Sequence, residues 1–453
     1  MSVIGQDVLK AAGPLQLCAG QEAGCEAAVH AMRQVFQSAA TDGILLVDAS
    51  NAFNNLNRQV ALRNIQFLCP PISTLLINCY RGNTLLFVGG EVLLSQEGTT
   101  QGDPLAMAMF ALASVPLIQK VSTAETTQAW FADDASSGGR LSALRAWWDK
   151  LVCYGPLFGY FPNASKTSLI VKPEQLTAAK EVFGDTAINI TPEGKRHLGA
   201  GLGTASFVEG FVASKVAEWV AEVRRLSEFA RSQPHAAFTA LSHGMIGRWV
   251  YLCRVSTCLG ALLQPLEDAV RRVLLPALTG QPAFGSRTRD LLALPARLGG
   301  LGVVNPTDLP AVHHPASLRV CAPIVQLILE QGGDILSAQS QQTTIRYRLS
   351  NEHRVLQQTQ ASDSVGSLSP PCNDAFLPLR RGEPLLGSLH CFLRFMAFRC
   401  TRVLFVTLCV FAMDGLSPWS LAHVLVVPSL IQIMRSSAGM VVIQHCITTR
   451  FAI

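Results

Sequence analysis

Three aspartates are the residues of this sequence whose type and spacing best suit chemistry. Asp48 ends the apolar run Gly43–Val47, and the pair Asp133 and Asp134 follows a short strand-like run over 128–131. Carboxylate oxygens are ligands that Mg²⁺ prefers, and the ion usually takes only one or two carboxylates from a protein. If the two strands are neighbours in one sheet, Asp48 and Asp133 can bridge two ions about 3.5–4 Å apart, the arrangement that serves nucleotidyl transfer.

Each carboxylate also has an ordinary interpretation. An aspartate at the end of a strand is more often a cap or turn residue, and an Asp-Asp pair in a tight turn is more often simply solvated. The order of the segments along the chain favours a catalytic role for the aspartates over these ordinary roles. A strand ends in Asp48, a Gly-rich loop then opens a helix at Asp103 and Pro104, and a strand, turn and strand carry Asp133 and Asp134.

Helical periodicity predicts many of the elements that surround these residues. Asp103 is expected to cap the free amides of a long apolar helix that runs towards Gln119, and Pro104 suits its first turn. The span 208–278 is helical without a clear strand, and its part 215–272 is basic, with eight Lys or Arg against five Asp or Glu. Further helices are predicted over 20–37, 57–68, 71–80 and 141–151.

Strand-like runs alternate with turn residues in the first half of the chain. Two of them, 84–88 and 91–95, flank Gly89 and Gly90 and predict a β-hairpin. The Ser- and Gly-rich residues 136–139 are expected to be a flexible exit from the Asp-Asp turn, and 197–203 a Gly-rich turn between short strands. The remaining strands are predicted over 43–47, 128–131 and 167–171.

Composition narrows the class of protein. The 453 residues allow two or three domains. Charged residues make up 15% of the chain and the net charge is +5, which permits a nucleic-acid partner without requiring one. The 13 cysteines show no zinc-finger or zinc-knuckle spacing, and the N-terminus shows no signal-peptide pattern. Free thiols in a reducing, intracellular compartment, nucleus or cytoplasm, are therefore expected.

The C-terminal part loses this periodicity. Residues 326–359 are rich in Gln and Ser, and 362–371 predict a Ser/Pro linker. The apolar runs 403–413 and 424–434 are shorter than the about 20 residues of a spanning helix, so no stable membrane association is expected. A membrane-associated protein built around these runs is the weaker alternative.

Five segments, in order, resemble the conserved motifs of reverse transcriptases of the non-LTR retrotransposon type. The resemblance covers about residues 13–307, and the spacing of its motifs is coherent throughout. The segments are VDASNAFNNLNR (47–58), EGTTQGDPLAMAMFALA (97–113), WFADDAS (130–136), GYFPNASKTSLIV (159–171) and HLGAGLG (197–203).

The resemblance implies an α+β fold of the right-hand polymerase type. It places residual fingers in 1–40, a palm of antiparallel sheet and packed helices in 41–206, a helical thumb and connection in 207–320, and a partly disordered tail in 321–453. Only Lys10 and Arg33 are basic before Asp48, where family members carry a long, basic fingers region. The chain therefore resembles an N-terminally truncated member of the family.

The resemblance also implies a set of metal and nucleotide ligands. Asp48, Asp133 and Asp134 would be the catalytic residues that hold two Mg²⁺ ions, with Mn²⁺ as an alternative. Asp134 would lie beside the other two and contact the second ion or the primer end. Lys166 would approach the leaving pyrophosphate, where a cation stabilises developing charge. Phe53, five residues after the first aspartate, would be the aromatic gate that favours deoxynucleotides; its ordinary interpretation is a core Phe.

The remaining roles concern nucleotide and nucleic acid. Gln101 and Gly102 would lie against the incoming nucleotide, because glycine lets backbone approach a base pair closely. His197, Leu198 and Gly199 would position the primer strand, although His197 could equally be an ordinary turn residue. In the thumb, the arginines that could contact phosphates are Arg224, Arg225, Arg248 and Arg254.

The function implied is an RNA-directed DNA polymerase. It would use an RNA template, a DNA primer and deoxynucleoside triphosphates, with a partner chain as a source of fingers or endonuclease. The alternative is a catalytically inactive remnant that at most binds nucleic acid. A polymerase that makes RNA is disfavoured only by Phe53.

Overall fold

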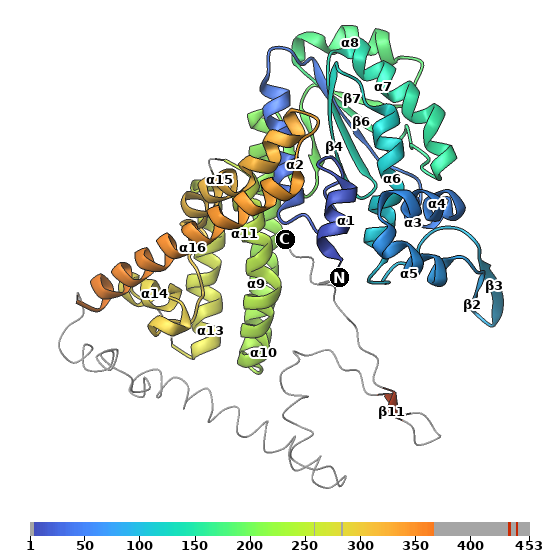
Figure 1. The fold of residues 1–453 in the computed structure, drawn as a ribbon. Helices are drawn as coiled ribbons and strands as arrows, with labels where there is room; N and C mark the ends of the chain where they lie inside the picture. Colours follow the sequence, from blue (N-terminus) through green and yellow to red (C-terminus); the bar gives the residue numbers. More distant parts are fainter. Residues whose placement is uncertain (1–3, 258, 282–283, 367–433, 436–440, 443–453) are drawn as a thin grey trace.

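A computed structural model describes residues 4–257, 259–281, 284–366, 434–435 and 441–442 of the chain. It is a mixed α and β structure in which helices predominate (Figure 1). Two large buried clusters lie on the sheet, and a third lies among the helices after it in the chain. We call residues 4–204, which include the sheet, the sheet unit, and residues 205–308, which follow it in the chain, the helical unit.

The sheet unit is built on five strands in the order β4-β5-β1-β6-β7. Every neighbouring pair is antiparallel except the pair of β6 and β7. The apolar strand β1 is buried along its whole length, as its central place in the sheet requires. The strands are β1 Gly43–Val47, β4 Thr126–Phe131, β5 Asp134–Gly139, β6 Ser168–Val171 and β7 Asn189–Thr191.

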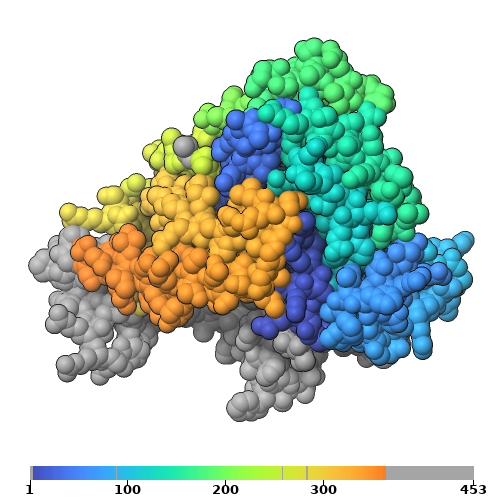
Figure 2. All heavy atoms as spheres, turned by 45° about the horizontal axis from the view of Figure 1, so that its top comes forward, coloured from blue at the N-terminus to red at the C-terminus, as the bar shows by residue number. Residues whose placement is uncertain are grey.

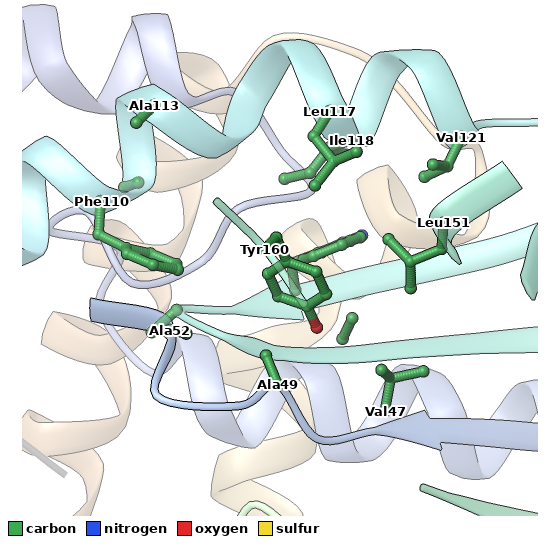
Figure 3. Close-up of a cluster of buried hydrophobic side chains, with 14 of the residues drawn as sticks. Val47, Ala49, Ala52, Phe110, Ala113, Leu117, Ile118, Val121, Leu151 and Tyr160 are labelled. Carbon is green, nitrogen blue, oxygen red and sulfur yellow. The ribbon is translucent and has the colours of Figure 1, made fainter. Parts of the chain in front are cut away.

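Alternate residues of β1 enter the cores on the two faces of the sheet. Leu45 and Val47 belong to the first core, which contains most of α6 (Ala106–Val121) and the apolar face of α7 (Leu141–Tyr154). In Figure 3, α6 residues such as Phe110 lie over the Val47 side of the sheet. Because α6 is apolar around its circumference, the core must enclose it on all sides.

The opposite face of the sheet packs against α2 (Gly24–Gln37), through Ile44 and Leu46 of β1. Beyond α2 lie α15 (Leu309–Leu329) and α16 (Ile335–Gly366), which share this core. Figure 2 shows these two helices, in orange, as one ridge beside the N-terminal residues in dark blue.

The elements between the first aspartate and α6 match the sequence prediction closely. The hairpin of β2 and β3 pairs Val88 with Glu91 around Gly89 and Gly90, and it extends away from the sheet (Figure 1). The helix after it begins at Ala106, later than predicted, because Asp103 caps the amide of Leu105 in the preceding turn at 2.8 Å. The other elements are α3 Ala52–Asn55, α4 Arg58–Leu68, α5 Pro70–Tyr80, β2 Thr84–Val88 and β3 Glu91–Ser95.

The helical unit comes after a second hairpin and α8. Its helices enclose a separate core in which the rings of Trp219 and Trp249 lie 6.4 Å apart. Its buried ion pair joins Arg289 Nη2 to Glu267 Oε2 at 2.7 Å. The last elements of the sheet unit are α8 Leu176–Phe183, β8 Gly194–His197 and β9 Ala200–Gly203. The helices of the helical unit are α9 Ala205–Ala230, α10 Pro234–Thr239, α11 Ile246–Val255, α12 Gln264–Ala269, α13 Leu275–Thr279 and α14 Ser286–Ala293.

A buried carboxylate joins the sheet unit to later helices of the chain. Glu26 of α2 accepts hydrogen bonds from Arg254 of α11 at 3.1 Å and from Ser317 of α15 at 2.7 Å. His30, one turn along α2, lies 2.9 Å from the same Ser317 hydroxyl. Three helices far apart in sequence are therefore fixed to one another.

One sequence prediction about the chain ends differs from the structure. Residues 321–366 were expected in a partly disordered tail, but they complete α15 and form α16. The residues expected as residual fingers form α1 (Gly5–Ala12) and α2, and α2 packs on the sheet itself. The apolar runs 403–413 and 424–434 lie outside the described residues, apart from Met434, and no described helix is long and apolar enough to cross a membrane.

A second prediction was wrong in a way that affects the candidate site. Residues 136–139, expected as a flexible exit, belong to β5, which pairs with both β4 and β1. Small residues suit this strand because α2 lies close above it. A Cβ at Gly138 would come within 2.4 Å of Val35 Cγ1.

This contact yields the first prediction. Gly138→Ala should lower the free energy of unfolding by about 1–3 kcal/mol, because the added methyl group overpacks the contact between β5 and α2. Adding Val35→Ala should recover part of the loss by making room. Urea denaturation measures both. Gly210→Ala is the control, since Gly210 lies in α9 with no atom close to the added Cβ and should be neutral or stabilising. A Gly138→Ala variant as stable as wild type would contradict the packing.

Candidate active site

The structure brings the three aspartates to one end of neighbouring strands. In the antiparallel pair of β1 and β5, Val47 lies opposite Ala135. Asp48 comes directly after Val47, and Asp134 precedes Ala135, so both leave the sheet at the same edge. Asp133 lies next to them, in the two-residue turn between β4 and β5.

The electrostatics of this edge are those of carboxylates held close together. Partial burial, and then the charges of Asp133 and Asp48, raise the pKa of Asp134 to about 6, although its side chain still reaches solvent. Burial also raises the pKa of Asp133; its own backbone amide offsets part of this rise, and Asp48 adds to it. Arg196, on β8, acts in the opposite direction on Asp134. Mutual repulsion of this kind is relieved by a cation.

The donor set fits hard divalent cations, but it is sparse. Among the described residues, no group of three or more His, Cys, Asp or Glu side chains forms a ready cluster for a metal ion. Asp48 and Asp133 can contribute the one or two carboxylates that Mg²⁺ takes from a protein. The other positions around each ion would then belong to water and to substrate phosphates.

The loop of the fourth motif lies directly against Asp48. The backbone amide of Asn163 donates to the carbonyl of Asp48 at 2.8 Å, and the amide of Ser50 donates to Phe161 at 2.9 Å. This pairing places Lys166 Nζ at 3.8 Å from Asp48 Oδ2. Both side chains are exposed, so the ion pair is weak and leaves Lys166 free to meet another anion.

Phe53 is half-buried and packed. Its ring stacks on Phe110 of α6, with ring centroids 4.5 Å apart. Its carbonyl accepts a hydrogen bond from Thr99 at 2.8 Å, and a Cβ at Gly98 would lie only 2.5 Å from that same carbonyl. The packing matches the ordinary interpretation of a core Phe, and it also fixes where the ring lies.

Gln101 and Gly102 lie together on an exposed turn just before α6. Gly102 has a φ of +94°, a value that favours glycine. Asp103 holds the end of the turn by accepting a hydrogen bond from Tyr80 of α5. The two residues are open to a ligand, and the turn that carries them is anchored.

The residues expected to position a primer form the tip of the second hairpin. Leu198 and Gly199, with φ of +45° and +82°, make the turn between β8 and β9. Tyr251 of α11 donates its hydroxyl to the carbonyl of Leu198. The ring of His197 is buried, its pKa is lowered to about 4 by that burial, and its Nε2 has no partner among the described residues. Of the groups at this tip, the backbone and the Leu198 side chain are therefore the ones that could contact a nucleic acid.

The arginines expected to contact phosphates divide into two groups. Arg248 pairs with Glu222 at 2.5 Å, and Arg254 pairs with the buried Glu26. Arg254 is therefore a structural residue. Arg224 and Arg225 lie exposed on α9 and remain open to a phosphate backbone.

Sequence reasoning missed residues that support the site. Gln16 is fully buried and hydrogen-bonds both the amide and the carbonyl of Ala132, beside Asp133. Tyr160, whose ring lies in the buried cluster of Figure 3, donates its hydroxyl to the carbonyl of Asp133 at 2.9 Å. Tyr160 lies inside the fourth motif and could have been suspected. Gln16 lies in a segment without helical or strand periodicity, so no sequence signal indicated it.

No family model matches the sequence, and no curated protein matches it. Among solved structures, apo telomerase from Candida tropicalis aligns with 66% of this chain and 53% of its own, at 12% identity and a TM-score of 0.35. Telomerase from Candida albicans, in complex with a fragment of telomeric RNA, aligns with 73% and 54%, at 11% identity and a TM-score of 0.39.

The chain spans about half the length of these two structures. Their TM-scores are too low to establish a shared fold, so the assignment of a function depends on the residues of this chain.

The close carboxylates yield the second prediction. Because the pKa of Asp134 is higher in the folded state than in the unfolded state, the folded state binds more protons between about pH 4 and 6. The free energy of unfolding therefore falls as pH rises through this window, and the ionised Asp134 side chain destabilises the folded state at neutral pH. Asp134→Asn should raise the free energy of unfolding at pH 7.5 in EDTA by about 1 kcal/mol, after allowance for solvent screening.

Thermal or urea unfolding at pH 7.5 and pH 4 measures this effect, which should shrink at the lower pH. Asp185→Asn is the matched control, because Arg145 lowers the pKa of that exposed carboxyl and its loss should not stabilise the fold. Equal stability of Asp134→Asn and wild type at pH 7.5 would show that neither burial nor the neighbouring carboxylates disfavour the charged form of Asp134 in the folded state.

Proposed function

We propose that this chain is the polymerase core of an RNA-directed DNA polymerase of the non-LTR retrotransposon type. One observation carries the proposal: Asp48 and the Asp133–Asp134 pair leave neighbouring strands at the same edge, with Lys166 beside Asp48. The motif order in the sequence supports the same reaction, which is attack of a primer 3′-hydroxyl on a deoxynucleoside triphosphate.

Asp48 and Asp133 would hold two Mg²⁺ ions, or Mn²⁺ in their place. When bound, these ions supply activation of the 3′-hydroxyl and neutralisation of the triphosphate. Asp134 would lie beside them and contact the second ion or the primer end. Burial, and then the neighbouring aspartates, raise the pKa of Asp134, and burial with a smaller contribution from Asp48 raises that of Asp133. A bound cation would favour the charged form of both carboxyls.

Lys166 would stabilise the leaving pyrophosphate. Its exposed ammonium lies within reach of the site, and its ion pair with Asp48 is too weak to hold it there. A cation aimed at an oxygen where negative charge develops lowers the barrier more than one that binds substrate and transition state equally.

Phe53, Gln101 and Gly102 would form the nucleotide pocket. The ring of Phe53 is held by its stacking on Phe110, so it cannot easily move aside for a ribose 2′-hydroxyl. Gln101 and Gly102 lie on an exposed, anchored turn, where a nucleotide could approach the backbone.

The hairpin tip of Leu198 and Gly199 would hold the primer strand, with His197 as its buried support. Tyr251 fixes this tip to the helical unit. Arg224 and Arg225 of α9 would contact phosphates of an RNA template and DNA primer duplex, reading shape rather than sequence.

One observation favours the alternative, an inactive remnant that binds nucleic acid. Of the two basic residues before Asp48, Arg33 is used inside the fold, where it donates to the carbonyl of Gly201 at 3.2 Å. Without free basic side chains before Asp48, a bound triphosphate would lack charge-assisted contacts from that part of the chain. A partner chain that supplies fingers would restore them.

The third prediction separates these two functions. With poly-rA template, oligo-dT primer, dTTP and Mg²⁺, the protein should extend the primer, and Asp133→Asn should reduce the rate by at least about a hundredfold. Asp185→Asn is the matched control and should keep the rate, since Asp185 pairs with Arg145 on the surface.

Extension should also disappear in EDTA. Wild-type protein that binds the template and primer duplex without extending it would support the remnant. Extension that survives Asp133→Asn would contradict the assignment of this carboxylate.

The fourth prediction concerns the sugar. Phe53→Val should raise the efficiency of ribonucleotide use relative to deoxynucleotide use by about tenfold or more, because the smaller side chain leaves room for a 2′-hydroxyl. The ratio of kcat/KM for UTP and dTTP measures it. Phe67→Val is a control for loss of an aromatic ring, since Phe67 is 76% exposed. An unchanged ratio in Phe53→Val would leave Phe53 as a core residue only.

A further inference from the structure

The turn that carries Asp133 has an unfavourable backbone at its first residue. Ala132 has a φ of +54°, in the left-handed region where side chains other than glycine are rarely found. It is buried, and it joins Phe131 of β4 to Asp134 of β5 through a turn of two residues, Ala132 and Asp133. A turn of this kind needs support from its surroundings to stay in one conformation.

Gln16 provides that support from the other end of the sequence. Its Oε1 accepts from the amide of Ala132 at 3.0 Å, and its Nε2 donates to the carbonyl of Ala132 at 3.1 Å. The same Nε2 donates to Ser114 Oγ at 2.9 Å, while that hydroxyl donates to the carbonyl of Ala111. The amide therefore has one orientation only, because a flipped amide would place a donor against the amide of Ala132.

The backbone around Gln16 is fixed as firmly as its side chain. The amide of Leu17 donates to the carbonyl of Trp130, and the amide of Trp130 donates to the carbonyl of Leu15, each at 2.8 Å. The segment thus pairs with the outer edge of β4 next to the turn. Gln16 has no exposed surface, so it contacts neither solvent nor substrate.

The second residue of the turn is held from the opposite side. Tyr160 donates its hydroxyl to the carbonyl of Asp133, and its ring lies 5.3 Å from that of Trp130. Between them, Gln16 and Tyr160 fix three backbone groups of the turn. This clamp sets the position of the Asp133 backbone, from which the carboxylate extends.

We propose that Gln16 is a positioning residue that holds the Ala132–Asp133 turn in its left-handed form and so places the Asp133 carboxylate for a divalent ion. The role rests on the proposed function, but the clamp itself does not. A partner that orients a metal ligand typically changes metal affinity by about 10–100-fold when it is lost.

The fifth prediction uses Gln16→Met, which keeps the volume but removes the amide. Hydrogen exchange at the Ala132 amide should accelerate, because that group loses its acceptor. The Mg²⁺ concentration for half-maximal extension should rise by about tenfold or more. Adding Ala132→Gly should recover part of the Mg²⁺ response, because glycine adopts the left-handed conformation without the clamp.

Gln128→Met is the matched control. Gln128 is also a fully buried glutamine of the sheet unit, but its amide does not bond the turn. It donates to the carbonyl of Ile118 and accepts from the indole N–H groups of Trp130 and Trp147. The Gln128→Met variant should lower the free energy of unfolding, as Gln16→Met also should. It should leave both the Mg²⁺ response and the hydrogen exchange of the Ala132 amide close to wild type.

The two readouts distinguish the ways of failing. Unchanged exchange at Ala132 in Gln16→Met would overturn the clamp. Faster exchange with an unchanged Mg²⁺ response, or an equal Mg²⁺ shift in Gln128→Met, would overturn the positioning role. If wild-type protein extends no primer, the proposed function fails, while the exchange measurement still decides whether Gln16 holds the turn.

Discussion

The pairing of β1 with β5 is the constraint on which the rest of the structure depends. Its register sets Val47 against Ala135 and thereby brings Asp48 next to a pair of aspartates 85 positions later in the chain. A shift of one residue would turn the side chains of a strand to the other face of the sheet. The apolar residues of β1, which enter separate cores on the two faces, make such a shift costly.

This arrangement gathers groups that would not otherwise lie together. Burial, and then the like charges of the neighbouring aspartates, raise the pKa values of Asp133 and Asp134, and Ala132 takes a backbone conformation that suits glycine. The buried amide of Gln16 and the hydroxyl of Tyr160 hold the turn despite both effects. Strain and repulsion that the surrounding fold maintains are typical of sites built for a ligand.

Much of the sheet unit could be predicted from the sequence, because its signals are local. The apolar run of β1, the Gly89-Gly90 hairpin and the helices after Asp48 depend on neighbouring residues. The failures arose where tertiary contacts decide. Small residues made β5 look flexible, although α2 packs on Gly138, and the polar sequence of α16 concealed a helix that shares a core with α2. Gln16 could not be found, because its partner Ala132 lies 116 positions away.

Iron-directed backbone cleavage tests most directly whether the carboxylates of the two strands share divalent ions. Fe²⁺ in place of Mg²⁺, with ascorbate and peroxide, produces hydroxyl radicals that cut the chain near the bound ion. We expect cuts at two places distant in sequence, around Asp48 and around Asp133, both suppressed by excess Mg²⁺. Cleavage at only one of these places, or at neither, would contradict this sharing of ions.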